Sequence, residues 1–257
     1  MASAPAAAGN LLHDGLTMRR WPSIALLVAV AGCGLPRQEA PQPSVPTPVV
    51  ERGLPESALS HPKTLAWVQR YCAKLAHHRA TELGLAPTRP LVPRVRAILV
   101  AQGLPPELSA VPAVESHYRP TARGHHGELG LWQLRPGTAR RFGLQVSKAR
   151  DERIQIDPST RAAARYLSFL HARYDDWPLA LAAYNAGPTR VDRALARRPG
   201  ASFWDLAERR ALPAISRDYV PKVLAVVRLN SVPGACDTAV TRAVPKKSDT
   251  PDVPDPT

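Results

Sequence analysis

The chain has 257 residues, 44% of them hydrophobic, and only three cysteines, which excludes a disordered chain and a disulfide-stapled scaffold. No apolar run reaches the roughly 18 residues of a membrane-spanning helix, so a multispanning transporter is excluded as well. The formal net charge is +13, but the 34 basic residues are scattered rather than gathered in one arm. Scatter disfavours a nucleic-acid-binding protein and leaves two readings open. One is a compositional preference for arginine, and the other is affinity for an anionic polymer or membrane face.

Residues 1–32 have the pattern of an export signal. Met18-Arg19-Arg20 is positively charged, and the apolar run from Ile24 to Ala31 is too short to remain as a membrane span. The run ends in Val30-Ala31-Gly32-Cys33, which resembles a bacterial lipobox. We therefore expect Cys33 to be the lipidated first residue of the mature protein, with translation starting at Met1 or Met18. Gly34 follows the cysteine instead of a retaining Asp, so we expect a lipoprotein on the periplasmic face of the outer membrane.

Three segments follow the export signal. Residues 33–61 hold five prolines between positions 36 and 48, a composition that favours an extended tether over a core. Residues 62–237 are expected to form one domain. Residues 238–257 have no apolar face and are expected to be a disordered tail.

The domain is predicted to be all-α. Apolar residues recur at steps of three and four in several stretches, each of which indicates one apolar face of a helix. These stretches are 65–75, 95–99, 163–174, 180–184, 191–195 and 223–227. Alternating strand patterns are absent from the sequence, apart from room for at most a short β-hairpin around residues 120–135.

Glu115 is the first candidate for chemistry. A helix that begins near Pro105 would end at Glu115-Ser116, where the helix dipole opposes a negative charge. Val111 and Val114 would remove water from the carboxyl, so both effects predict a raised pKa for Glu115. A carboxyl that is protonated near neutral pH can act as a general acid. A lone Glu in a last helical turn is more commonly a surface residue, so this position alone does not decide the matter.

Four further segments change the balance. They are Gly127-Glu-Leu-Gly-Leu-Trp-Gln133, Ala182-Ala-Tyr-Asn-Ala-Gly187, Phe203-Trp-Asp-Leu206 and Tyr219-Val-Pro-Lys222. With Val114-Glu115-Ser116, their order and spacing resemble the soluble-lytic-transglycosylase-like (SLT) catalytic domain of glycoside hydrolase family 23, which is related in fold to goose-type lysozyme. The resemblance covers roughly residues 90–230. It implies a lysozyme-like fold and an enzyme that cleaves the MurNAc-GlcNAc β-1,4 bond of peptidoglycan without water, leaving 1,6-anhydroMurNAc ends.

The resemblance also implies roles for individual residues. Glu115 becomes the single general acid and base, Ser116 positions sugar groups, and the Tyr184 hydroxyl and Asn185 amide face the scissile sugar. The remaining substrate-binding residues implied are Leu131, Trp132 and Gln133 on the cleft wall, and Tyr219. No cofactor or metal is implied, and the expected partners are peptidoglycan glycan strands and, through the lipid anchor, the membrane. As alternatives, Trp132 and Tyr184 could be ordinary core aromatics, and Tyr219 a packing residue near Pro221.

One departure from the family pattern keeps other functions open. Glu128 stands where the family usually has Ala, which puts a second carboxylate near the cleft. A lysozyme-like hydrolase needs such a second carboxylate, so hydrolysis on the same fold is one alternative. A non-catalytic murein-binding lipoprotein is the other. We expect an exposed Glu128 that takes no part in the reaction.

The remaining candidates for chemistry are cysteines and histidines. Cys72 and Cys236 remain after lipidation of Cys33 and could pair in an oxidising periplasm, although Cys72 could equally be a small buried residue. The adjacent pairs His77-His78 and His125-His126 lack the spacing of zinc ligands, so we expect no metal site there.

Overall fold

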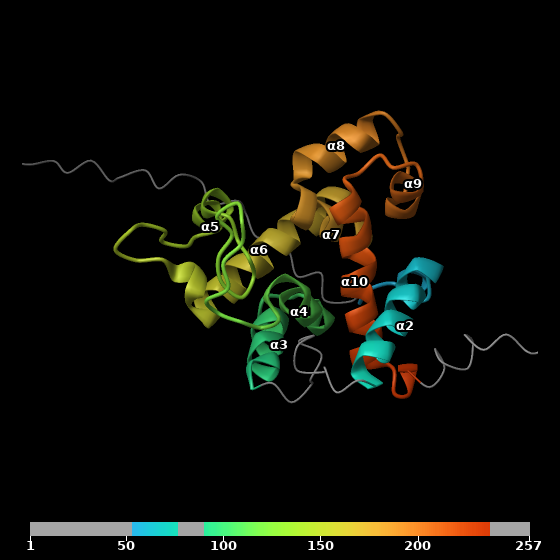
Figure 1. The fold of residues 1–257 in the computed structure, drawn as a ribbon. Coiled ribbons are helices and arrows are strands. Elements are labelled where there is room, and N and C mark those ends of the chain that lie inside the picture. Colours follow the sequence, from blue (N-terminus) through green and yellow to red (C-terminus); the bar gives the residue numbers. More distant parts are fainter. Residues whose placement is uncertain (1–52, 77–89, 237–257) are drawn as a thin grey trace, which may run out of the picture. The chain divides into compact units, whose positions relative to one another are not determined.

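Helices account for nearly all regular structure in residues 53–76 and 90–236, the part of the chain that the computed structural model describes (Figure 1). The expected lipobox with Cys33, the Pro-rich segment up to residue 52 and the C-terminal tail lie outside these residues. None of the helices described is long and apolar enough to cross a membrane.

Every stretch in which the sequence periodicity predicts a helix is helical, further short helices occur outside these stretches, and the all-α fold class is confirmed. In chain order they are α1 (Glu56–Leu59), α2 (Pro62–Ala76), α3 (Leu91–Ala101), η1 (Pro106–Ser109), α4 (Ala110–Ser116), α5 (Pro136–Arg141), η2 (Glu152–Ile154), α6 (Ile156–Tyr174), α7 (Trp177–Ala186), α8 (Pro188–Ala196), α9 (Phe203–Glu208) and α10 (Ala214–Ser231). Here η denotes a 3-10 helix. Around residues 120–135 the described chain forms isolated antiparallel bridges, Arg123 with Leu129 and Leu129 with Leu134, in place of a hairpin.

The core forms around α6, α7 and α10. Helix α7 packs against both α6 and α10, and α10 also packs against α2 and α4 (Figure 1). Side chains with no exposed surface fill the space between them, including Leu167 of α6, Leu181 of α7 and Leu224 of α10. Because α10 touches both α4 and α7, it brings residues far apart in the chain to one place.

The segment before Glu115 is not the single helix that the sequence predicts. It begins as the 3-10 turn η1 and continues as α4. Pro112 explains the change, because its nitrogen has no hydrogen to donate to the carbonyl of Leu108 four residues earlier. Pro112 is the third residue of α4, a position at which a backbone N–H has no partner within the helix, so α4 can contain the proline. The helix ends at Ser116, at the predicted boundary.

A disulfide closes the far end of the packing between α2 and α10. Cys72 of α2 is bonded to Cys236, five residues after the end of α10, with 5.4 Å between their Cα atoms. The bond spans 164 residues of sequence, so the loop that it closes contains the helices from α3 to α10.

Candidate active site

Glu115 lies in the last turn of α4, at the edge of the core. His117 caps the helix in the left-handed conformation, with φ at 52°, so the chain turns away sharply after Ser116. Val111 and Ser116 are buried, whereas the Glu115 side chain is half-buried. The carboxyl therefore keeps some access to solvent from an otherwise apolar setting.

The setting of Glu115 raises the pKa of its carboxyl from 4.5 to about 7. Burial is the largest cause, because it disfavours the charged form. Tyr219 opposes this rise, and the negative charge of Glu128 adds to it. Near neutral pH a substantial fraction of Glu115 therefore holds a proton that it can give to a substrate.

Two tyrosines from different helices interact electrostatically with the acid. Tyr219 of α10 is 4% exposed, and its hydroxyl is close enough to Glu115 for each to shift the other's pKa. No described residue meets ordinary hydrogen-bond geometry with that hydroxyl. Tyr184 of α7 is also in the electrostatic range of Glu115, and burial raises the pKa of both tyrosines well above 10. Both hydroxyls thus remain protonated donors at any physiological pH.

Asn185 follows Tyr184 and is held by α10. Its Oδ1 accepts a hydrogen bond of 2.7 Å from the Ser216 hydroxyl, which fixes the orientation of the amide. Ser216 is buried and lies one turn before Tyr219 on the same helix. One turn of α10 therefore orients two of the predicted site residues, Asn185 and Tyr219. The sequence reasoning missed Ser216, although its spacing of three from Tyr219 was a usable signal.

Three of the predicted cleft residues point into the protein instead. Leu131 is 1% exposed and Trp132 is 0% exposed. The Trp132 indole N–H donates a hydrogen bond of 2.9 Å to the hydroxyl of Thr160 in α6. Ser116 is 1% exposed, and its hydroxyl donates 2.8 Å to the Leu131 carbonyl. Because these three side chains are buried behind the site, their placement does not favour direct contact with the sugar. Tyr184 contacts the same segment, donating 2.7 Å to the Trp132 carbonyl.

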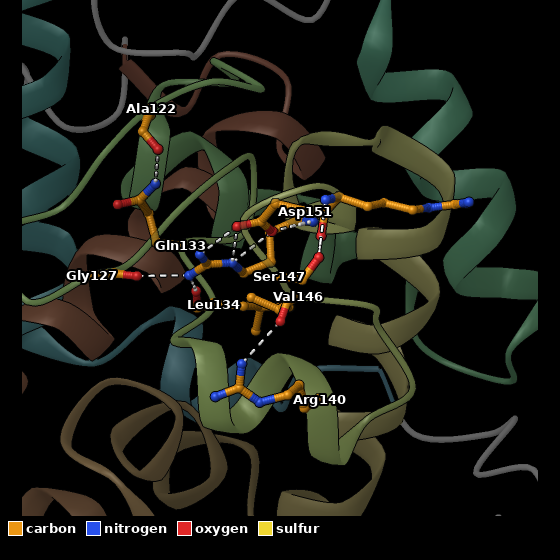
Figure 2. A network of polar contacts seen from close by, with 10 residues as sticks. Ala122, Gly127, Gln133, Leu134, Arg140, Val146, Ser147 and Asp151 are labelled. Atoms are coloured by element: carbon orange, nitrogen blue, oxygen red, sulfur yellow. Dashed lines mark hydrogen bonds and ion pairs between the residues drawn. The ribbon is translucent and has the colours of Figure 1, made fainter.

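Gln133 holds the loop that carries this segment. Its amide nitrogen donates to the carbonyl of Ala122, at 3.0 Å (Figure 2), and to that of Gly130, at 2.7 Å. Its backbone has a φ of 47°, an uncommon value for a residue with a side chain. In this backbone conformation, the Gln133 side chain holds both sides of the loop together through the two hydrogen bonds.

The loop is also fastened to η2 by Arg153. The guanidinium donates to the carbonyls of Gly127, at 2.7 Å, and Leu134, at 3.0 Å, and pairs with Asp151 at 2.6 Å (Figure 2). Gly130 completes the fit: with φ at +88°, a Cβ there would overlap the Arg153 carbonyl oxygen. The loop therefore requires glycine at position 130. Nothing in the sequence pattern pointed to Arg153.

Glu128 of this loop is not the exposed residue that the sequence predicts, because its side chain is only 23% exposed. One carboxylate oxygen accepts 2.8 Å from the backbone N–H of His126, and the other lies 3.7 Å from the Arg135 guanidinium. Partial burial raises the pKa of Glu128, but backbone N–H groups, His126 and Arg135 together outweigh it and lower the pKa overall. Glu128 is therefore an anion held by its own loop, in the electrostatic field of Glu115.

Comparison with known proteins agrees with this geometry. Residues 97–207 match the family model described as "Transglycosylase SLT domain". The matched segment contains Glu115, the loop with Gln133, and Tyr184.

One relative is the membrane-bound lytic murein transglycosylase D of Escherichia coli (strain K12), which is 38% identical over 130 residues. These residues make up 49% of this chain and 28% of that protein. A protein of Alteromonas sp. (strain M-1), named for tributyltin chloride resistance, is 43% identical over 95 residues, 37% of this chain and 46% of its own length. The chain thus spans less than half of either relative.

A solved structure supports the fold. The 70 kDa soluble lytic transglycosylase SLT70 of Escherichia coli superposes with a TM-score of 0.50 and 24% identity, over 68% of this chain and 29% of that one.

Proposed function

We propose that the protein is a peptidoglycan lytic transglycosylase that uses Glu115 as its single general acid and base. The observation that carries the proposal is a half-buried carboxyl with a pKa of about 7, which interacts electrostatically with Tyr184 and Tyr219 and lies in the segment that matches the SLT family model. The names of the relatives, one of them a membrane-bound lytic murein transglycosylase, agree with this substrate class.

The reaction takes two proton transfers. Glu115 first protonates the oxygen that joins MurNAc to GlcNAc, and the bond from MurNAc C1 to that oxygen breaks. The N-acetyl group of the substrate stabilises the positive charge that develops at C1. The ionised Glu115 then removes the proton from the MurNAc 6-hydroxyl as this oxygen attacks C1, which closes the 1,6-anhydro ring and restores the acid. GlcNAc leaves with a free 4-hydroxyl, and no water, metal or cofactor is consumed.

The direct test is Glu115→Gln, which keeps the shape of the side chain and removes the titratable proton. Purified murein sacculi are incubated with each protein, and the soluble products are identified by mass spectrometry. We expect anhydro-ended products from the wild type and from Glu208→Gln, a control at an exposed glutamate, and none from Glu115→Gln. Solubilisation by Glu115→Gln at a rate near that of the wild type would remove Glu115 from this role.

Glu128 favours one second candidate, hydrolysis of the same bond. A second carboxylate in the field of Glu115 could activate a water molecule, as two-carboxylate glycosidases do. Against this, its contacts with the His126 N–H and Arg135 hold the carboxylate to its own loop. We expect Glu128→Ala to retain most activity and the same anhydro products. Reducing MurNAc ends in the wild type that disappear in Glu128→Ala would establish hydrolysis.

We further propose that the chain is an outer-membrane lipoprotein anchored through Cys33. The lipobox-like segment and the following tether support this location, and several acyl chains would make the anchoring stable. Metabolic labelling with a fatty acid and membrane fractionation of Cys33→Ser test it. An unlabelled wild type, or a Cys33→Ser variant that stays in the same membrane fraction, would contradict the proposal.

A further inference from the structure

We propose that Trp67, Arg70 and Lys222 form a binding platform for a carboxylate of the peptide stems that MurNAc residues carry. The proposal rests on the function proposed above and specifies which part of the substrate this surface recognises. The three residues come from α2 and α10, and both helices lie outside the segment that matches the family model.

The platform is built on one indole ring that carries two cations. The Arg70 guanidinium lies 4.7 Å from the centre of the Trp67 ring, and the Lys222 ammonium lies 4.6 Å from the same centre. Both distances are within the range of a cation–π attraction. The sum of these distances sets an upper limit of about 9 Å on the separation of the two charges, so an anion at the edge of the ring lies in the electrostatic field of both.

Neither cation is neutralised by the part of the chain that the structure describes. The ion pairs found within residues 53–76 and 90–236 include other arginines, such as Arg228 with Glu56, but neither Arg70 nor Lys222. Arg70 is exposed, and Trp67 and Lys222 are half-buried, so the charges remain accessible. Two like charges held this close favour the binding of an anion.

The platform is also rigid before any ligand binds. Trp67 packs against the core and contacts the Tyr71 ring, with 5.8 Å between the ring centres. Helices α2 and α10 pack side by side (Figure 1). The disulfide of Cys72, five residues after Trp67, ties α2 to the chain just beyond α10. Little conformational entropy is then lost when a ligand binds.

The position of the platform suits a group attached to the bound glycan. Lys222 follows Tyr219 by three residues on α10, so the two side chains lie on neighbouring parts of one helix face, with Cβ atoms about 5–6 Å apart. Tyr219 faces Glu115, whereas Lys222 faces Trp67. A MurNAc residue placed for protonation by Glu115 would therefore extend its peptide, and the carboxylates on it, within reach of both cations.

The test compares two soluble, uncrosslinked glycan substrates of equal length. One bears its peptide stems, and the other has been stripped by an amidase. We measure kcat/KM on both substrates with the full-length chain and with Arg70→Gln/Lys222→Gln. The matched control is Arg141→Gln, which removes another cation over aromatic rings, those of Phe142 and Phe169.

The readout is the ratio of kcat/KM on the peptide-bearing strand to that on the stripped strand. We expect the ratio to fall about three- to tenfold in the double variant, as two solvent-accessible charge contacts imply, and to stay at the wild-type value in Arg141→Gln. A wild-type ratio in the double variant overturns the platform. If the double variant keeps the wild-type ratio but binds phosphatidylglycerol vesicles more weakly, the two charges serve lipid headgroups, and the platform proposal is overturned as well.

The single variant Arg70→Gln, at an exposed position, repeats the measurement if the double variant proves unstable. A failure of the proposed function looks different, because the wild type would then release no anhydro product from either strand.

Discussion

The raised pKa of the Glu115 carboxyl has a cost in stability that can be measured. The unfolded chain binds a proton at Glu115 with a pKa near 4.5, and the folded protein does so at about 7. Both states are protonated below pH 4.5, so the group then has no effect on folding. As the pH rises from about 4.5 to about 7, the unfolded state loses its proton first, and the folded state is destabilised. The difference between the two pKa values corresponds to about 3 kcal/mol as an upper estimate.

Glu115→Gln removes this penalty because glutamine cannot ionise. The variant is expected to match the wild type at pH 4 and to exceed its free energy of unfolding by up to about 3 kcal/mol at pH 8. For a domain of this size that is a rise in Tm of up to about 6 to 12 °C. Urea unfolding and calorimetry at both pH values measure it, with the exposed Glu208→Gln as the control. An equal difference at pH 4 and pH 8, or a wild type that is the more stable at pH 8, would refute the explanation of the pKa.

Three further predictions follow from the same structure. Activity should fall as the pH rises through about 7, because Glu115 then loses its proton. Glu128 raises the pKa of Glu115 and Tyr219 lowers it. In pH profiles of kcat/KM, this fall in activity should therefore move to lower pH in Glu128→Gln and to higher pH in Tyr219→Phe. Cys236→Ser should lose up to about 4 to 5 kcal/mol of stability by denaturant unfolding, because the disulfide closes a long loop, and an unchanged midpoint would contradict this. Gly130→Ala should lower Tm far more than Gly200→Ala, because both glycines have a positive φ but only Gly130 lies against the Arg153 carbonyl, and equal losses would show that backbone conformation alone matters.

The sequence predicts the helices well because their signal is local. The apolar positions of α2, α6 and α10 recur at the period of a helix, and no long-range contact is needed to see them. The position of Glu115 at a helix end and the rise in its pKa are predicted for the same reason. Only Pro112 changes the detail, by replacing the start of the expected helix with a 3-10 turn.

Motifs do not reveal which way side chains point. Leu131 and Trp132 stand beside Gln133 in one motif, yet their side chains are in the core, while Gln133 binds two loop carbonyls. A loop without regular periodicity has no pattern from which to read direction. The Arg153 contacts are harder still to foresee, because Arg153 lies 26 residues from Gly127 and no motif includes it.

These distant contacts matter to the acid because α4 has only seven residues and would not be stable alone. Packing against α10 holds it on one side. On the other side, Ser116 at its end is bonded to the Leu131 carbonyl. Leu131 in turn lies within the loop whose two ends, Gly127 and Leu134, are fastened by Arg153. The burial that raises the pKa of Glu115 is therefore maintained by residues that touch no substrate, and their loss should alter the acid before it alters the fold.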